Sequence, residues 1–347
     1  MEGTLKKGRI IGLLLLLLLA FLLDISIGSI KIPLGEVFRI LFSFHSENST
    51  WQFIVEKIRF PKACTAVLAG FGLSVGGLQM QTLFRNPLAD PAVLGVTSGA
   101  NLGVASIMLA GGGSASLYAI KELGFSGSWL ITCAACAGAG GVMLLVLALS
   151  SRLNSNVMML IIGIMIGSIT LSVISIWQYL SDPDLVKEYL LWNFGSLGGV
   201  TGSQLVILSL VVAAGLIIAF LSSKKLDALL LGENYARSMG LTPKKARIII
   251  ICSTSLLAGG ITAFCGPIGF VGIAVPHITR SLFNTSSHRI LIPACCLVGS
   301  VLMLLCDTAA QLPGFQTVLP INIITALIGA PLVIWIILHK NNLRNFG

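Results

Sequence analysis

The sequence predicts an all-α membrane protein with ten transmembrane helices. Composition is the first reason, because 55% of the 347 residues are hydrophobic, only 10% are charged, and the mean hydropathy is +0.95. Soluble domains are about 25% charged. Length is the second reason, because ten apolar segments reach the roughly 17 to 25 residues that are needed to cross a bilayer.

The expected spans follow one another along most of the chain. They lie at residues 10–30, 62–84, 91–110, 128–150, 155–180, 203–222, 244–265, 266–282, 290–312 and 320–339. The third and the eighth are short and rich in glycine, which indicates close packing against neighbouring helices. The first could alternatively be a secretory signal peptide, but residues 24–28 after it make a poor cleavage site, so we expect an uncleaved helix.

An even number of spans places both termini on one side of the membrane. Fifteen of the 22 Lys and Arg residues fall on that side and seven on the other. Because cytoplasmic loops carry the excess of Lys and Arg, both termini are predicted to be cytoplasmic. The net charge of +9 then reflects topology, and no nucleic-acid partner is expected.

Cysteines and nucleotide motifs indicate no cofactor or metal bound by this chain. All eight cysteines lie in apolar segments, so no disulfide framework is expected. Cys133 and Cys136 form a C-x-x-C motif, but no second pair or His follows at ligand spacing, and packing of small residues explains it. The chain has no G-x-x-x-x-G-K-[ST] motif, so it cannot form a P-loop by itself. No catalytic residue is predicted either.

Two connections differ from the short loops elsewhere. The outer excursion, residues 25–59, has mixed charge and is predicted to be partly helical, to lie over the membrane surface and to offer a docking surface. The inner loop, residues 222–247, is too polar to span but has apolar residues at helical spacing. It is predicted to form two short helices that are broken near Gly232.

The chain also suggests an internal repeat. Residues 62–180 and 244–339 each hold four expected spans, and each set contains one of the short, glycine-rich helices. Five helices separate the two sets, so the second set would cross the membrane in the opposite direction. Inverted repeats of this kind build transporters with alternating access.

Two motifs combine prolines with glycines at a predicted helix boundary. In the elbow, Arg85 to Pro91, two prolines remove backbone donors and disfavour helix in the residues before them. Gly95, Gly99 and Gly103 follow at four-residue spacing and would let another backbone approach. A plain helix-breaking loop is the alternative. Residues 266–280 repeat the pattern, and their His277 has no sequence neighbour that suggests catalysis.

These motifs carry a resemblance to a known family. The sequences RFPK, RNPLADP with LGVTSGA, LGENYARSMGL, GPIGFVGIAVPHITR and LPINIITALIGAPLVIWII begin at residues 59, 85, 94, 231, 266 and 319. In this order they resemble the FecCD permeases, the membrane subunits of ABC importers for iron-siderophores, haem and cobalamin. The resemblance runs from about residue 59 to the end of the chain.

The resemblance implies the BtuC-like fold of type II importers in a bacterial inner membrane. All 347 residues would form one permease domain, paired with a second copy in a homodimer or close heterodimer. Two cytoplasmic ATPase subunits would bind ATP and Mg, and a periplasmic or lipoprotein binding protein would deliver the substrate, an iron chelate or cobalamin.

The resemblance also implies roles for individual residues. Coupling to the ATPase, in the loop 224–242, falls to Leu226, Leu229, Leu230, Gly232, Glu233, Tyr235, Ala236, Arg237, Met239 and Gly240. A cytoplasmic gate falls to Asn86, Leu88, Ser155 and Asn156. The pathway would be lined by Met158, Met159, Gly163, Met165, Gly167, Asn322, Thr325 and Gly329. Docking of the binding protein falls to Arg59 and Lys62, but a third basic position of the family is Gln311 here.

Asp307 leaves two interpretations open. A carboxylate deep in a span is costly and often functional, which would suit a proton-coupled secondary transporter. The resemblance favours a structural role near the outer mouth, with hydrogen bonds inside the bundle. An intramembrane enzyme is a third possibility, which the lack of a nucleophile–base or metal-ligand spacing disfavours.

Overall fold

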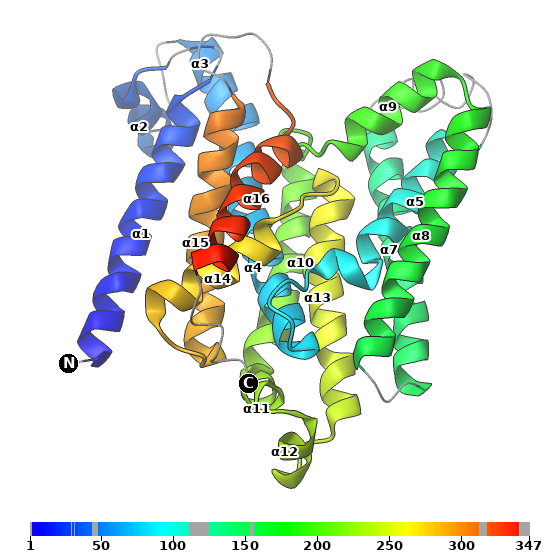
Figure 1. Ribbon diagram of the computed structural model, residues 1–347. Coiled ribbons are helices and arrows are strands. Elements are labelled where there is room, and N and C mark those ends of the chain that lie inside the picture. Colours follow the sequence, from blue (N-terminus) through cyan, green and yellow to red (C-terminus); the bar gives the residue numbers. More distant parts are fainter. Residues whose placement is uncertain are drawn as a thin grey trace.

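The computed structural model describes residues 2–28, 30, 32–43, 48–110, 125–152, 156–311 and 318–339. Every regular element in these ranges is a helix, so the predicted all-α class is confirmed. The long helices run between two ends of the molecule (Figure 1). One end carries α11 (Ser223–Leu230) and α12 (Glu233–Ser238), and the other carries α9 (Pro183–Asn193). We call these two ends of the molecule the α12 end and the α9 end.

Seven helices of the described ranges are long and apolar enough to cross a membrane. One of them is continuous through α3 (Ser49–Phe53), the π-helix η1 (Ile54–Arg59) and α4 (Phe60–Phe84). The others are α1 (Glu2–Ser26), α7 (Phe125–Arg152), α8 (Asn156–Leu180), α10 (Gly202–Leu221), α13 (Pro243–Cys265) and α15 (His288–Ala310).

The remaining three expected spans hold helices with shorter apolar parts. These are α5 (Val96–Met108), α14 (Val271–Phe283) and α16 (Ile321–His339). Each of the ten expected segments therefore contains a helix, but the count of ten full spans is not reached by length and composition. The α9 helix was not expected from the sequence.

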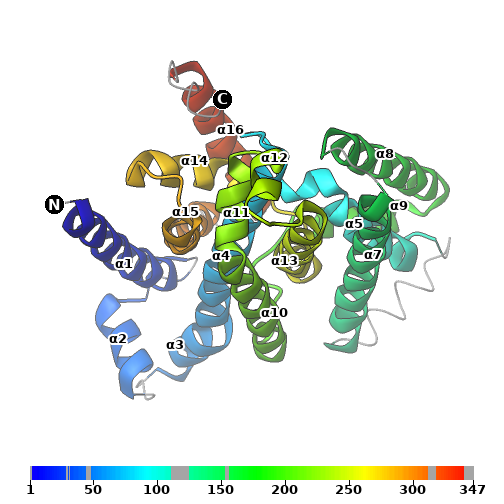
Figure 2. The ribbon, with the colours of Figure 1, turned by 90° about the horizontal axis from the view of Figure 1, so that it is seen from below.

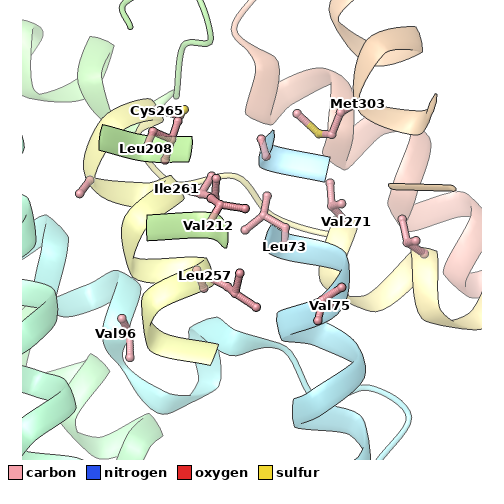
Figure 3. Packing of buried hydrophobic residues seen from close by; sticks show 14 of the residues in the cluster. Leu73, Val75, Val96, Leu208, Val212, Leu257, Ile261, Cys265, Val271 and Met303 are labelled. Atoms are coloured by element: carbon pink, nitrogen blue, oxygen red, sulfur yellow. The ribbon is translucent and has the colours of Figure 1, made fainter. Parts of the chain in front are cut away.

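Three helices form the interior of the molecule. Most residues of α4, α13 and α15 are buried, whereas less than a third of the membrane-spanning part of α1, α7, α8 and α10 is buried. Figure 3 shows Leu73 of α4 beside Val271 of α14, with Leu257 and Ile261 of α13 across from them. Helices that are apolar on all sides suit a membrane protein, because lipid is as apolar as the core.

Small residues set the closest helix contacts, as the sequence predicted for the two glycine-rich helices. A Cβ added to Gly99 of α5 would collide with the backbone of Gly138 on α7, and one on Gly77 of α4 would collide with the backbone of Gly272 on α14. Gly70 of α4 meets the backbone of α15 in the same way. These contacts let backbones pack directly, which is how helices associate without a hydrophobic driving force.

The two predicted repeat regions pack in matching ways. In the first, α5 packs on α7 and α8, and in the second, α14 packs on α15 and α16. Between them, α4 packs on α14 and α15, whereas α13 packs on α5 and α7. Exchanging the two sets of helices reproduces these contacts.

The outer excursion is partly helical, as predicted. It contains α2 (Leu34–Ser43), then α3 and η1, and the last two continue into α4. Figure 2, seen from the α12 end, shows α2 at the edge of the molecule beside α1. Its inner residues Val37 and Ile40 are buried against the rest of the protein.

Candidate functional site: the coupling helices and the elbow

The inner loop forms two short helices that break where predicted. Gly232 separates α11 from α12 with φ of 113°, and Gly240 ends the pair with φ of 80°. Both angles lie in the left-handed region, where a residue with a Cβ is strained. The break between α11 and α12 therefore depends on Gly232, and the turn that follows α12 depends on Gly240.

Burial divides the apolar residues of this pair into two groups. Leu226, Leu229 and Ala236 are buried inside the protein, and Leu230 is half-buried. The exposed apolar side chains are Leu231, Tyr235 and Met239, at 62%, 50% and 59%. The predicted set of coupling residues is thus corrected, since its buried members Leu226, Leu229 and Ala236 pack on this chain and cannot contact a partner.

A buried ion pair anchors α12 to α13. Glu233, the first residue of α12, accepts a 2.8 Å hydrogen bond from Arg247, whose side chain is 2% exposed. The exposed Arg237 lies 3.8 Å from the other oxygen of Glu233. Because a buried guanidinium without a counter-ion is strongly destabilising, the Glu233–Arg247 pair fixes where α12 sits.

A chain of hydrogen bonds anchors α11 to the bundle. Asp227 Oδ1 accepts from the backbone N–H of His288 at 2.8 Å and lies 2.7 Å from His288 Nδ1. On the other side of the ring, His288 Nε2 lies 2.8 Å from the hydroxyl oxygen of Thr82. The Asp227–His288–Thr82 chain thus joins α11, the start of α15 and the end of α4.

The electrostatics of Asp227 fit this arrangement. Partial burial favours the neutral acid, but the hydrogen bonds from His288 outweigh it and lower the pKa of Asp227 below its usual value. The carboxylate is therefore ionised at neutral pH and remains an acceptor for His288.

The elbow begins three residues after Thr82 and is a well-defined turn. Arg85 ends α4 in the left-handed region, with φ of 49°. Asn86 Oδ1 accepts from the backbone N–H of Leu88 at 3.0 Å, and Leu88 is 46% exposed. Asp90 then accepts from the backbone of Ala92 at 2.9 Å and caps the short helix η2 (Pro91–Leu94).

Residues of α14 hold the elbow in place. His277, which is buried, lies with Nε2 2.9 Å from the carbonyl oxygen of Pro87. Arg280 donates a 2.8 Å hydrogen bond to Gln81, and Gln81 donates to the backbone of α14 at Ile273 at 3.2 Å. The two proline- and glycine-containing motifs therefore meet, which the sequence did not indicate.

The other predicted gate residues can be placed only in part. Ser155 lies outside the described residues, and Asn156 is the first residue of α8 with a side chain outside the described part. Asn86 is half-buried. Of the predicted gate, the structure therefore brings only Asn86 and Leu88 together.

Burial raises the pKa of Asp90 to about 6. The folded protein then binds this proton more tightly than the unfolded chain, so the free energy of unfolding falls as pH rises from about 4 to about 6. We expect Asp90→Asn, which can still cap η2, to be more stable than the parent by about 3 kcal/mol above pH 6 and nearly equal to it near pH 4. Thermal melting in detergent across this range measures the difference, and parallel pH profiles would contradict it.

The predicted pathway residues fall into exposed and buried groups. Met158 and Met165 of α8 are about half exposed, but Met159 and Gly163 are buried, and Gly167 is half-buried. On α16, Thr325 and Gly329 are buried inside the chain.

Asn322, near the start of α16, is half-buried and accepts a 3.0 Å hydrogen bond from the backbone of Gly269. It thus fixes a loop of this chain. Among the predicted pathway residues, only the two exposed methionines are clearly available to line a path outside this chain.

The predicted docking residues have partners inside the protein. Arg59 is 7% exposed and donates to the backbone carbonyls of Ile25, at 2.8 Å, and of Ser26 and Ile30. Lys62 forms a 2.9 Å ion pair with Asp307. A contact of either residue with a binding protein would have to compete with these bonds.

Asp307 belongs to a buried polar cluster near the α9 end, and this cluster comprises Asp24, Lys62, Asp307, Thr308 and Gln311. Gln311 donates to Asp24 at 3.1 Å and to Asp307 at 3.3 Å, and Thr308 donates to Asp24 at 3.1 Å. The amide at position 311, where the resembling family has a basic residue, thus bridges two carboxylates. Asp307 has the structural surroundings that the resemblance implied.

Known proteins are similar to this chain over nearly its full length. The FecCD transport family matches residues 16–339. The vitamin B12 import system permease BtuC of Salmonella arizonae is 33% identical over 95% of this chain and 94% of that permease. The hemin transport system permease HmuU of Yersinia pestis is 31% identical over 99% of this chain and 100% of that permease.

A solved structure is also similar to this chain over nearly its full length. The inward-facing conformation of a metal-chelate type ABC transporter superposes with a TM-score of 0.82 and 27% sequence identity, covering 96% of this chain and 99% of that chain. The chain therefore belongs to the FecCD transport family and is the permease subunit of an ABC importer, not its ATPase.

Proposed function

We propose that this permease carries a metal chelate, such as haem, cobalamin or an iron-siderophore, across the bacterial inner membrane. The observation that supports it most is similarity over nearly the full chain to permeases for vitamin B12 and for hemin. The exposed methionines 158 and 165 suit this substrate class, because an uncharged lining lets a large ligand slide without binding tightly.

The exposed side chains Leu231, Tyr235 and Met239 are the proposed contact for a cytoplasmic ATPase. They belong to α12 and to the residues that flank it, and α12 lies at one end of the molecule (Figure 1). Aromatic side chains and methionine are enriched at protein interfaces. The α12 end is then cytoplasmic, as the distribution of Lys and Arg predicts, and so are both termini.

The two four-helix regions act as inverted repeats in this proposal. Support comes from their matching neighbours, since exchanging α4, α5, α7 and α8 with α13, α14, α15 and α16 reproduces most of the helix contacts. Rocking of such repeats exposes a central path to one side and then the other.

A second copy of the permease completes the path. The elbow lies between α8 and α16 on one face of the molecule in both views (Figures 1 and 2). Both helices expose apolar side chains, including Met165 of α8 and Leu327 of α16. A twofold partner on this face would place two elbows opposite each other, at the proposed gate.

Reconstitution tests the transport function. Proteoliposomes containing the permease, an ATPase subunit and a binding protein are expected to accumulate labelled hemin or cyanocobalamin only with ATP. Vesicles without the ATPase are the control. Uptake by the permease alone, driven by a proton gradient, would contradict the proposal and favour the secondary transporter.

Leu88→Ala tests the gate. Shortening this exposed side chain is expected to widen the closed gate, so that substrate leaks through the permease without ATP while binding-protein affinity stays unchanged. Efflux of preloaded substrate from proteoliposomes measures the leak. The control is Ala92→Ser, because Ala92 is also exposed and lies close to Leu88 in the sequence. Equal efflux from both variants would show that the elbow is a plain loop without a gating role.

A further inference from the structure

The short helix α2 presents three chemically different faces. Val37 and Ile40 are buried against the protein, whereas Phe38 and Phe42 are 42% and 80% exposed. The third face carries Glu36 and Arg39, which form a 3.2 Å ion pair. With about 100° of turn per residue, the three faces are separated by roughly 100° to 150°.

The two phenyl rings form one apolar surface. Their centroids lie 6.3 Å apart and their planes differ by 11°, so the rings are stacked. A helix surrounded by water on its outer side would not be expected to expose such a pair next to a separate charged face. Two different solvents on two sides of the helix explain this division better.

The neighbouring helix indicates which solvent meets the phenyl face. α2 packs on α1, whose exposed side chains are apolar along most of its length, including Leu15, Leu18 and Leu19. In Figures 1 and 2 both helices lie at the same edge of the molecule, with α2 near the α9 end of α1. Ile30, in the connection between them, is also 46% exposed. The lipid-facing surface of α1 therefore continues toward α2.

We propose that α2 is an interfacial helix that lies in the membrane surface at the α9 end, with Phe38 and Phe42 inserted among lipid headgroups and upper acyl chains. Glu36 and Arg39 then face water, and Val37 and Ile40 attach the helix to the bundle. Helices of this kind lie in the plane of the interface with large apolar side chains on the lipid side. The α2 part of the outer excursion would thus bind lipid, not a binding protein.

Photocrosslinking distinguishes these possibilities. p-Benzoylphenylalanine replaces Phe42 in one variant and Arg39 in a second, matched variant of the full chain, and each is reconstituted in phospholipid nanodiscs. After illumination, mass spectrometry of the intact protein is expected to find phospholipid adducts several-fold more abundant at position 42 than at position 39.

Three outcomes would overturn the proposal. They are equal lipid labelling at both positions, no lipid adduct at position 42, and crosslinks from position 42 to an added binding protein. The readout does not depend on transport, so it can fail while the importer function stands. Folding of both variants is checked by monodisperse elution and unchanged melting before illumination.

Discussion

Replacing His288 with alanine is expected to leave ATP hydrolysis active while substrate uptake per ATP falls about tenfold, the scale of a typical coupling free energy between two sites. The reason is geometric. His288 joins Asp227 of the coupling helix α11 to Thr82, three residues before the elbow. A movement that an ATPase imposes on α11 would reach the elbow through this ring. Proteoliposomes that report hydrolysis and uptake together measure the ratio.

Conservative variants separate the two bonds of His288. His288→Asn can keep the contact with Asp227 but not the one with Thr82, and Thr82→Val removes the second contact from the other side. Both are expected to lower uptake per ATP, as His288→Ala does. Tyr235→Ala is the contrasting control, because it should weaken ATPase binding and leave the ratio intact. If uptake per ATP is unchanged in both His288→Asn and Thr82→Val, the His288 ring only stabilises the fold.

The helices were largely predictable because apolar length and glycine spacing are local signals. The break between α11 and α12 near Gly232 was predictable for the same reason, since a glycine interrupts two short apolar patterns. The direction of their side chains was not. Leu226 and Leu231 are both leucines in a short amphipathic segment, and only the tertiary contacts bury the first and expose the second.

Contacts between distant residues were outside the reach of sequence patterns. Nothing local connects Asp24 to Gln311, or His277 to Pro87, yet these bonds define the polar cluster and the position of the elbow. The α9 helix was missed because it is too short and polar to span. A signal for it existed in Asp182 followed by Pro183, an N-cap and first-turn pattern typical of a helix start.

Lys62→Met is expected to be the most destabilising single change near the α9 end. It leaves Asp307 in a buried site with no cation at 2.9 Å, joined through Gln311 to the second carboxylate, Asp24. Gln311 contacts both acids but carries no charge to balance them. Breaking a buried ion pair from one side costs about 3 to 5 kcal/mol. Thermal melting and the monodisperse fraction in detergent measure the loss.

A double-mutant cycle identifies the pair as the cause. Adding Asp307→Asn to Lys62→Met removes the unbalanced charge, and the amide oxygen can still accept from Gln311, so most of the lost stability should return. The cycle also tests the docking role expected from the sequence. If Lys62→Met melts like the parent but binds the binding protein more weakly, Lys62 serves docking. If stability falls and Asp307→Asn restores it, the lysine is chiefly the counter-ion that keeps two acids inside the membrane protein.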